Sequence, residues 1–111
     1  MKNTLISCAL VLAFSTPLAI AGGDATAGKT KSAACASCHG AEGISPTSAF
    51  PNIGGQYESY LLRSIKRYKS GERQNAIMQG MVAALSEDDM ADLAAYYASV
   101  PGALKDGSLQ P

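Results

Sequence analysis

The sequence predicts an all-α fold of three to four short helices in one small domain. No segment alternates apolar and polar residues for long enough to supply a β-strand. Apolar residues instead recur at spacings of three and four in residues 56–69 and 86–100, as they do on one face of a helix. Residues 40–55 are too rich in glycine, proline and serine for either element, so we expect a loop there.

The chain begins with a stretch typical of a secretory signal peptide. Lys2 gives it a positive start, residues 5–14 are almost unbroken apolar sequence, and residues 19–21 form a small-x-small cleavage site. We therefore expect cleavage after Ala21, export to the periplasm and a single mature domain at residues 22–111. No later stretch approaches the roughly 20 apolar residues of a transmembrane helix.

The mature chain is close to neutral. All nine acidic residues lie beyond the signal peptide, whereas one of the nine basic residues lies within it, so the formal charge after cleavage is −1. This balance gives no indication of nucleic-acid binding.

The first mature helix is expected from Asp24 to Cys35. Asp24 is a suitable N-cap, because its carboxylate can accept hydrogen bonds from the N–H groups of the first turn. Gly28 is unusual here, since a glycine inside a helix costs up to about 1 kcal/mol relative to alanine. We interpret it as a position where another helix packs closely.

The most specific signal is Cys35-Ala36-Ser37-Cys38-His39, whose C-x-x-C-H spacing is typical of covalent attachment of a c-type haem. Each cysteine can form one thioether to the porphyrin, and the adjacent imidazole can bind the iron as its proximal ligand. The sequence therefore predicts one haem c per chain, held by Cys35, Cys38 and His39. A buried macrocycle would also supply apolar volume to a short domain that has no tryptophan.

Three other sites could use the same motif. A thioredoxin-like dithiol would need a βαβ context, which this pattern does not provide. A zinc site would need further ligands, yet His39 is the only histidine and Cys8 lies in the predicted signal peptide. A disulfide between Cys35 and Cys38 would close too short a loop to stabilise the fold much, and it would leave the histidine unexplained.

The loop at residues 40–55 can wrap the edge of a flat cofactor. One of its carbonyl groups could accept the second ring N–H of His39, which would fix the tautomer and the orientation of the imidazole. Pro51 is the candidate for that carbonyl. The alternative, that the prolines only stiffen the loop, stays open at this point.

The second helix is expected from Gln56 to Lys69 and is ended by Gly71. Its apolar positions form a stripe suited to core packing: Tyr57, Leu61, Ile65 and Tyr68. Its basic positions form a row that is either a solvated face or a docking surface for a partner: Arg63, Lys66 and Arg67, extended by Lys69 and Arg73.

The sixth ligand of the iron is expected from residues 73–85, a loop or short helical turn. This segment contains Met78 and Met81, and a soft, neutral thioether suits ferrous iron. Either methionine could instead fill a gap in the core. Met90 is a weaker candidate, because it belongs to the apolar face of the last helix.

The last helix is the clearest by pattern. Ser86 is an N-cap that forms an approximate capping box with Asp89, and the acidic first turn complements the helix dipole. One apolar face follows, and Pro101 and Gly102 end the helix. That face consists of Met90, Leu93, Ala94 and Tyr97.

Four segments together resemble a class I c-type cytochrome, of the small bacterial kind that includes cytochrome c-553 and each half of the two-haem cytochrome c4. These segments are Cys35–Gly40, Phe50–Gln56, Ile77–Met81 and Leu85–Tyr97. The resemblance covers nearly the whole mature chain. One motif implies one haem, where the two-haem proteins have two.

The resemblance implies a role for each site residue. Cys35 and Cys38 would carry the thioethers, His39 would be the proximal ligand and Pro51 would hold His39 through its carbonyl. The liganding methionine of the family lies seven residues before the leucine of the L-S-x-x-D segment, which selects Met78 over Met81. The family also crosses its first and last helices, so Gly28 would face the region of Tyr96 and Tyr97.

The expected function is one-electron transfer between redox protein partners by a soluble periplasmic monomer that forms transient complexes. A haem with both axial positions filled has no open site for a substrate, so the chain is not expected to be an enzyme. Two alternatives remain. One is a gas sensor or peroxidase-type protein with an open sixth position, and the other is an electron-carrying subunit of a larger periplasmic oxidoreductase.

Overall fold

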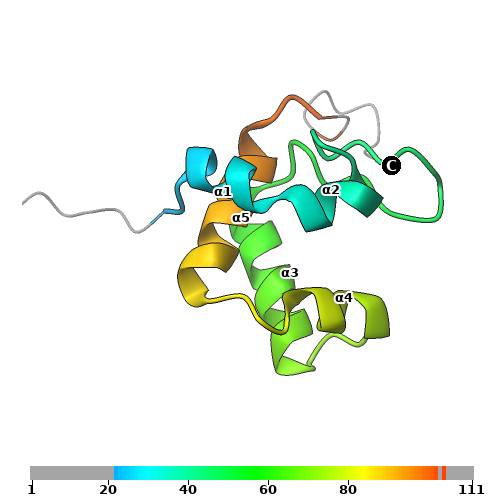
Figure 1. Cartoon of the computed structure of the whole chain (residues 1–111), viewed down its shortest axis with the longest axis vertical. Helices are drawn as coiled ribbons and strands as arrows, with labels where there is room; N and C mark the ends of the chain where they lie inside the picture. Colours follow the sequence, from blue (N-terminus) through cyan, green and yellow to red (C-terminus); the bar gives the residue numbers. More distant parts are fainter. Residues whose placement is uncertain (1–21, 103, 105–111) are drawn as a thin grey trace, which may run out of the picture.

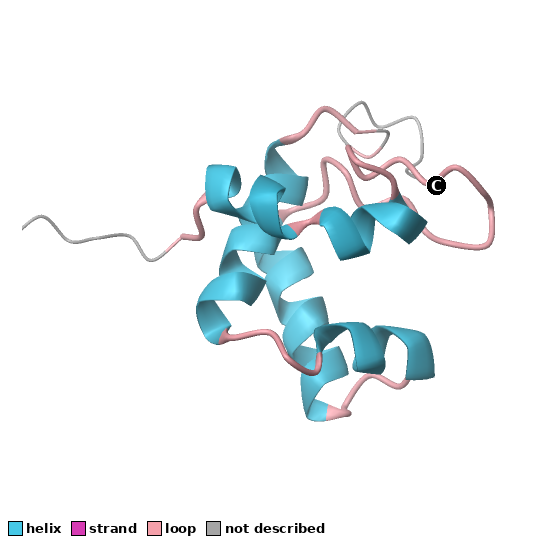
Figure 2. Cartoon of the chain, viewed as in Figure 1, coloured by secondary structure: helices cyan, strands magenta, loops and turns pink. Residues whose placement is uncertain are grey.

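The computed structural model describes residues 22–102 and 104, and these residues form five helices and no strand (Figures 1 and 2). The helices are α1 (Ala25–Lys31), α2 (Ala33–His39), α3 (Glu58–Ser70), α4 (Ala76–Val82) and α5 (Glu87–Ser99). The predicted all-α class is confirmed. The predicted signal peptide lies outside the described residues, and no helix within them is long and apolar enough to cross a membrane.

The number of helices exceeds the prediction because the first expected helix is divided. Asp24 caps α1 as predicted, and its Oδ1 accepts two N–H groups of the first turn. The break lies at Ser32, whose Oγ donates to the carbonyl oxygen of Lys29 at 2.8 Å. The chain then continues as α2 to His39, so the C-x-x-C-H motif lies within a helix of its own, which ends at Gly40 with φ of 82°.

The crossing of α1 and α5 forms the centre of the fold (Figure 1). A Cβ atom added at Gly28 would lie 2.0 Å from the carbonyl oxygen of Asp92 and 2.8 Å from the Cβ of Tyr96. Only glycine lets the two backbones approach this closely. The interpretation of Gly28 as a packing position is therefore confirmed.

Helix α5 supplies most of the core. The Ser86 and Asp89 capping box forms as predicted, with both reciprocal hydrogen bonds present. All four residues of the predicted apolar face are buried, and so are Ala95 and Tyr96. The buried surface is wider than one stripe because α5 packs against α1 as well as α3.

Helix α3 begins two residues later than predicted and ends at Gly71, which adopts the left-handed conformation with φ of 81°. Leu61 is buried as expected. Tyr57 is instead 76% exposed, because it precedes the helix as its N-cap residue and does not join the apolar stripe.

Two acidic side chains of α5 clamp the end of α1. Lys31 Nζ lies 2.8 Å from Asp89 Oδ1 and 2.6 Å from Asp92 Oδ2. Asp92 also accepts the backbone N–H of Asp24 at 2.7 Å. The lysine partner lowers the pKa of both carboxyl groups, and the two carboxylates raise the pKa of Lys31. These contacts secure the crossing from outside the core.

Candidate functional site

Helix α2 brings the two thiols and the imidazole of the motif together on one side. Residues three and four positions apart share a face of a helix, so Cys35 lies beside both Cys38 and His39. Both cysteines are half-buried free thiols, and His39 is buried. Cys35 packs against the core cluster that contains Leu61 and Tyr97, and burial raises the pKa of its thiol.

The ring of His39 is held from the loop at residues 40–55. Its Nδ1 lies 2.8 Å from the carbonyl oxygen of Pro51. A carbonyl oxygen can only accept, so Nδ1 carries the proton, and the lone pair of the neutral ring lies on Nε2. This arrangement leaves one ring nitrogen of His39 available as a metal ligand.

Helix α5 anchors both ends of this loop. The Tyr96 hydroxyl donates to the carbonyl oxygen of Ala41 at 2.7 Å, and the N–H of Gly55 donates to the carbonyl oxygen of Tyr97 at 2.8 Å. The α1 and α5 crossing thereby supports the segment that contacts His39.

The three candidate methionines differ in burial. Met90 is 1% exposed and belongs to the core. Met78 and Met81 both lie in α4, which Asn75 caps by accepting the backbone N–H of Met78 at 3.0 Å. Met78 is half-buried, whereas Met81 is 43% exposed. The burial pattern favours Met78 as the methionine that points toward the interior.

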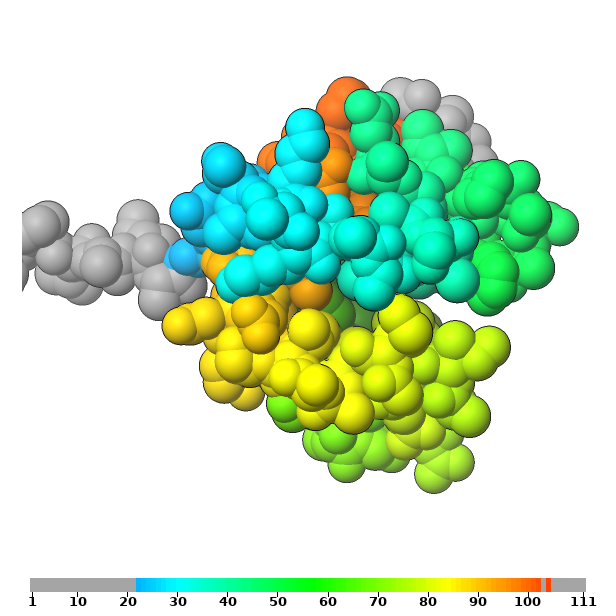
Figure 3. All heavy atoms as spheres, viewed as in Figure 1, coloured from blue at the N-terminus to red at the C-terminus, as the bar shows by residue number. Residues whose placement is uncertain are grey.

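A furrow separates α2 from the side of the molecule that contains α4 (Figure 3). Among the helices, α2 has its main contact with α1, and α4 has its main contact with α3. Large apolar side chains are exposed on the segments to either side, namely Ile44 in the loop, and Ile77 and Met81 in α4.

These features fit a haem. The donor set comprises two thiols, one imidazole with Nδ1 protonated and one half-buried thioether, and the exposed apolar side chains are of the kind that a macrocycle would cover. Among the described residues no three His, Cys, Asp or Glu side chains lie together as a metal site, so the zinc alternative finds no ligand set there.

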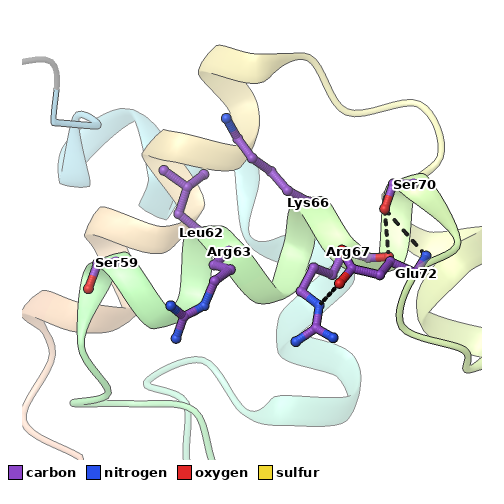
Figure 4. Close-up of a pocket in the computed structure, with 7 residues that line it drawn as sticks. All are labelled: Ser59, Leu62, Arg63, Lys66, Arg67, Ser70 and Glu72. Carbon is purple, nitrogen blue, oxygen red and sulfur yellow. Dashed lines mark hydrogen bonds and ion pairs between the residues drawn. The ribbon is translucent and has the colours of Figure 1, made fainter.

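The basic row of α3 lines a shallow groove, in which Lys66 and Leu62 point to one side of the helix and Arg63 and Arg67 to the other (Figure 4). Most of its cations already have partners within the chain. Lys66 Nζ lies 2.5 Å from Glu87 Oε2, and Arg67 Nε lies 3.0 Å from Glu72 Oε1.

Lys69 and Arg73, which extend the row, also have partners within the chain. Lys69 donates to the carbonyl oxygen of Leu85, and the guanidinium of Arg73 lies 4.8 Å from the ring centre of Tyr68. The row therefore links α3 to the residues around it, and the groove lies apart from the motif in α2.

The structure adds two residues that the sequence did not single out. The backbone N–H of Ser45 donates a hydrogen bond to the side chain of Asn52, the residue that directly follows Pro51. Serine and asparagine are common turn residues, so nothing in their local sequence distinguished them from the rest of a loop rich in such residues.

Comparison with known proteins gives a consistent result. The family model described as Cytochrome c matches residues 25–101. A cytochrome c4 of Pseudomonas aeruginosa is 48% identical over 99 residues, which are 89% of this chain and 49% of that protein. A cytochrome c-554(548) of Halomonas halodenitrificans is 45% identical over 80 residues, which are 69% of this chain and 96% of that protein.

A solved structure shares the fold as well. The reduced recombinant cytochrome c4 from Pseudomonas stutzeri superposes with a TM-score of 0.69 at 40% identity, over 72% of this chain and 47% of that chain. The chain thus spans about half the length of the cytochrome c4 relatives that it matches.

Proposed function

The chain belongs to the cytochrome c family, and from this we propose that it carries single electrons in the periplasm through one covalently bound haem c. Cys35 and Cys38 provide the two thioether bonds, His39 is the proximal iron ligand and Met78 is the distal ligand. When bound, the haem supplies the one-electron couple between ferric and ferrous iron.

The observation that carries this proposal is the contact between His39 and Pro51. With Nδ1 donating to the Pro51 carbonyl at 2.8 Å, the ring presents only Nε2 as a ligand, and its orientation is restrained. The hydrogen bond leaves Nε2 as the one ring nitrogen that can bind iron, which supports His39 as the proximal ligand.

Ligation of the iron by Met78 favours electron transfer over catalysis as the function. A soft thioether stabilises ferrous iron, and a filled sixth position leaves no place for a substrate to bind. No other histidine exists in the chain to serve as a distal acid or base. Met81 is the less suitable ligand because its side chain is more exposed.

The partners of this carrier are redox proteins that donate and accept its electron. We propose transient complexes formed by a monomer, because a carrier must release one partner before it meets the next. Two cations of α3, Lys66 and Arg67, are already paired with carboxylates within the chain, so we expect them to contribute less to such docking than unpaired cations would.

The first experiment compares absorption spectra of the protein matured in a bacterial periplasm with those of Met78→Ala and Met81→Ala. The wild-type protein should show covalent haem, a methionine-to-iron charge-transfer band and no binding of carbon monoxide. Met78→Ala should lose the band and bind carbon monoxide rapidly, whereas Met81→Ala should keep the wild-type spectrum.

Three outcomes would contradict the proposal. If Met78→Ala retained the charge-transfer band, another side chain would be the ligand. If the wild-type protein itself bound carbon monoxide readily, the sixth position would be open and a sensor or peroxidase-type function would replace electron transfer. Co-purification with one stable partner at high salt would favour a subunit of a larger oxidoreductase instead.

A further inference from the structure

We propose that Asn52 and Ser45 are positioning residues, which hold the Pro51 carbonyl against His39 and so tune the electron donation of the imidazole to the iron. The inference rests on the proposed function only in taking His39 as the iron ligand. Neither residue forms a hydrogen bond with the imidazole, and both act through the backbone of the loop at residues 40–55.

The evidence is a closed circuit of hydrogen bonds that begins and ends in the motif. The Ser45 hydroxyl lies 3.0 Å from the carbonyl oxygen of Cys38, the residue directly before His39. The Ser45 backbone N–H donates to Asn52 Oδ1 at 2.7 Å. Asn52 directly follows Pro51, whose carbonyl accepts from His39 at 2.8 Å. Ser45 is thereby tied to the carbonyl that precedes His39, and Pro51 is tied to the His39 ring itself.

The two residues do not contribute equally to this circuit. The Ser45 hydroxyl has one proton, and the carbonyl oxygen of Thr47 also lies 2.7 Å from it, so the bond to Cys38 is shared. The bond to Asn52 comes from a backbone N–H and has no competitor. Asn52 is therefore expected to matter more than Ser45.

Backbone packing behind the loop limits how it can adjust. The carbonyl oxygen of Gly43 accepts from the N–H groups of Ile53 and Gly54 at 2.8 and 2.9 Å. A Cβ atom at Gly102 would lie 2.0 Å from the carbonyl oxygen of Gly54, so the chain after α5 packs directly against this part of the loop. With that side fixed, Asn52 controls the remaining freedom of the Pro51 peptide.

The chemical consequence concerns the proton on Nδ1. An imidazole that donates to a well-placed carbonyl is more basic at its other nitrogen and donates more strongly to a metal, which stabilises the ferric state. If the Pro51 carbonyl drifts away, that donation weakens. Loss of the Asn52 contact should therefore raise the reduction potential and expose the Nδ1 proton to solvent.

The test measures two properties of the intact haem protein: the reduction potential, and the exchange rate of the His39 Nδ1 proton by NMR of the ferrous form. Asn52→Ala should raise the potential and accelerate exchange roughly tenfold, as expected when a hydrogen bond to a ring N–H is weakened. Ser45→Ala should change both in the same direction but less. Thr47→Ala is the matched control, because its hydroxyl accepts only from Ala49 in the exposed part of the same loop.

Asn52→Asp separates positioning from simple loop damage. The carboxylate keeps an acceptor for the Ser45 N–H, so exchange of the Nδ1 proton should return to near the wild-type rate. If Asn52→Ala fails to mature, Asn52→Asp and Ser45→Ala still carry the test. Wild-type values in both properties for Ser45→Ala and every Asn52 variant obtained would overturn the inference and leave the proposed function standing. A wild-type protein that shows no iron-bound His39 would overturn the proposed function itself.

Discussion

Two halves of the molecule are built differently. The core half contains the crossing of α1 and α5 together with α3. The site half contains α2, the loop at residues 40–55 and α4. Within residues 22–102, all but one of the buried hydrophobic residues lie on α3 or α5, and the exception is Val82 at the end of α4. In the site half, Ile77 is 60% exposed and Met81 is 43% exposed. Its order depends on backbone hydrogen bonds and on the contact of His39 with Pro51.

This difference shows which part of the domain the polypeptide can pack without a cofactor. The crossing has close backbone approach, a buried apolar interior and a charged clamp at its edge. The site half has a furrow where a core would be expected (Figure 3). A macrocycle bonded to α2 would supply the missing apolar contacts, so cofactor binding and folding of this half should be coupled.

The largest effect is expected when both proposed thioether attachment sites are removed. Cys35→Ala with Cys38→Ala should abolish covalent haem entirely, as measured by the haem stain of the denatured protein. Hydrogen exchange should then show α4 and the loop at residues 40–55 with little protection, while amides at the centre of α5 stay comparatively protected. Equal loss of protection in both regions would show that the crossing also depends on the cofactor.

A matched pair of glycine substitutions gives the next largest effect. Gly28→Ala places a Cβ 2.0 Å from a backbone oxygen of α5, so it should destabilise the protein by about 2 to 3 kcal/mol. At Gly80 in α4, no atom beyond the neighbouring backbone of its own helix lies within 4 Å of the new Cβ, so Gly80→Ala should stabilise by about 0.5 to 1 kcal/mol.

Urea unfolding of the two haem proteins measures both changes. The two variants test the difference in packing between α1 and α4, because the substitution is identical and only its position differs. A similar loss of stability at both positions would mean that α4 is packed as closely as α1 once the haem is bound.

A smaller effect is expected at Tyr97. Its hydroxyl is buried and forms no hydrogen bond of ordinary geometry among the described residues; burial raises the pKa of Tyr97 to about 12, and only a weak interaction with the Ser32 side chain opposes that rise. Removing an unsatisfied buried polar group relieves its desolvation cost, so Tyr97→Phe should stabilise the protein by about 1 kcal/mol. A loss of stability in the haem-bound protein would instead show that the hydroxyl gains a partner when the cofactor is in place.

The smallest effect is expected from the charged clamp, which lies at the surface of the crossing. Lys31→Met should lower the melting temperature modestly at neutral pH, because it removes the partner of Asp89 and Asp92. Lys29→Met is the control, since no ion pair involves Lys29 in the described part of the chain.

The pH dependence of this loss follows from the direction of the pKa shifts. Both carboxyl groups have a lowered pKa in the folded state, so their contribution is present above the ordinary aspartate value of 3.8 and disappears as pH falls through the folded value. The pKa of Lys31 is raised, so its contribution persists below its ordinary value of 10.5 and is lost only as pH rises through the folded value. A deficit in Lys31→Met that did not shrink in acid would contradict an electrostatic clamp.

Local features were predictable because neighbouring residues determine them. The capping box of Ser86 and Asp89, the Asp24 cap and the end of α3 at Gly71 all depend on hydrogen bonds within a few residues. The C-x-x-C-H motif is also local, because its chemistry needs only the spacing along one helix.

The tertiary structure decided features that depend on residues far apart in the chain. Tyr96 is buried because α1 covers a second face of α5, and the amphipathic pattern of α5 alone does not reveal this. In the basic row of α3, Lys66 pairs with Glu87 and Lys69 donates to the carbonyl oxygen of Leu85, two partners that only folding brings near. The circuit through Ser45 and Asn52 closes onto His39 for the same reason. The local conformational preferences of residues can be predicted from the sequence, but the long-range partners of their side chains depend on how the helices pack.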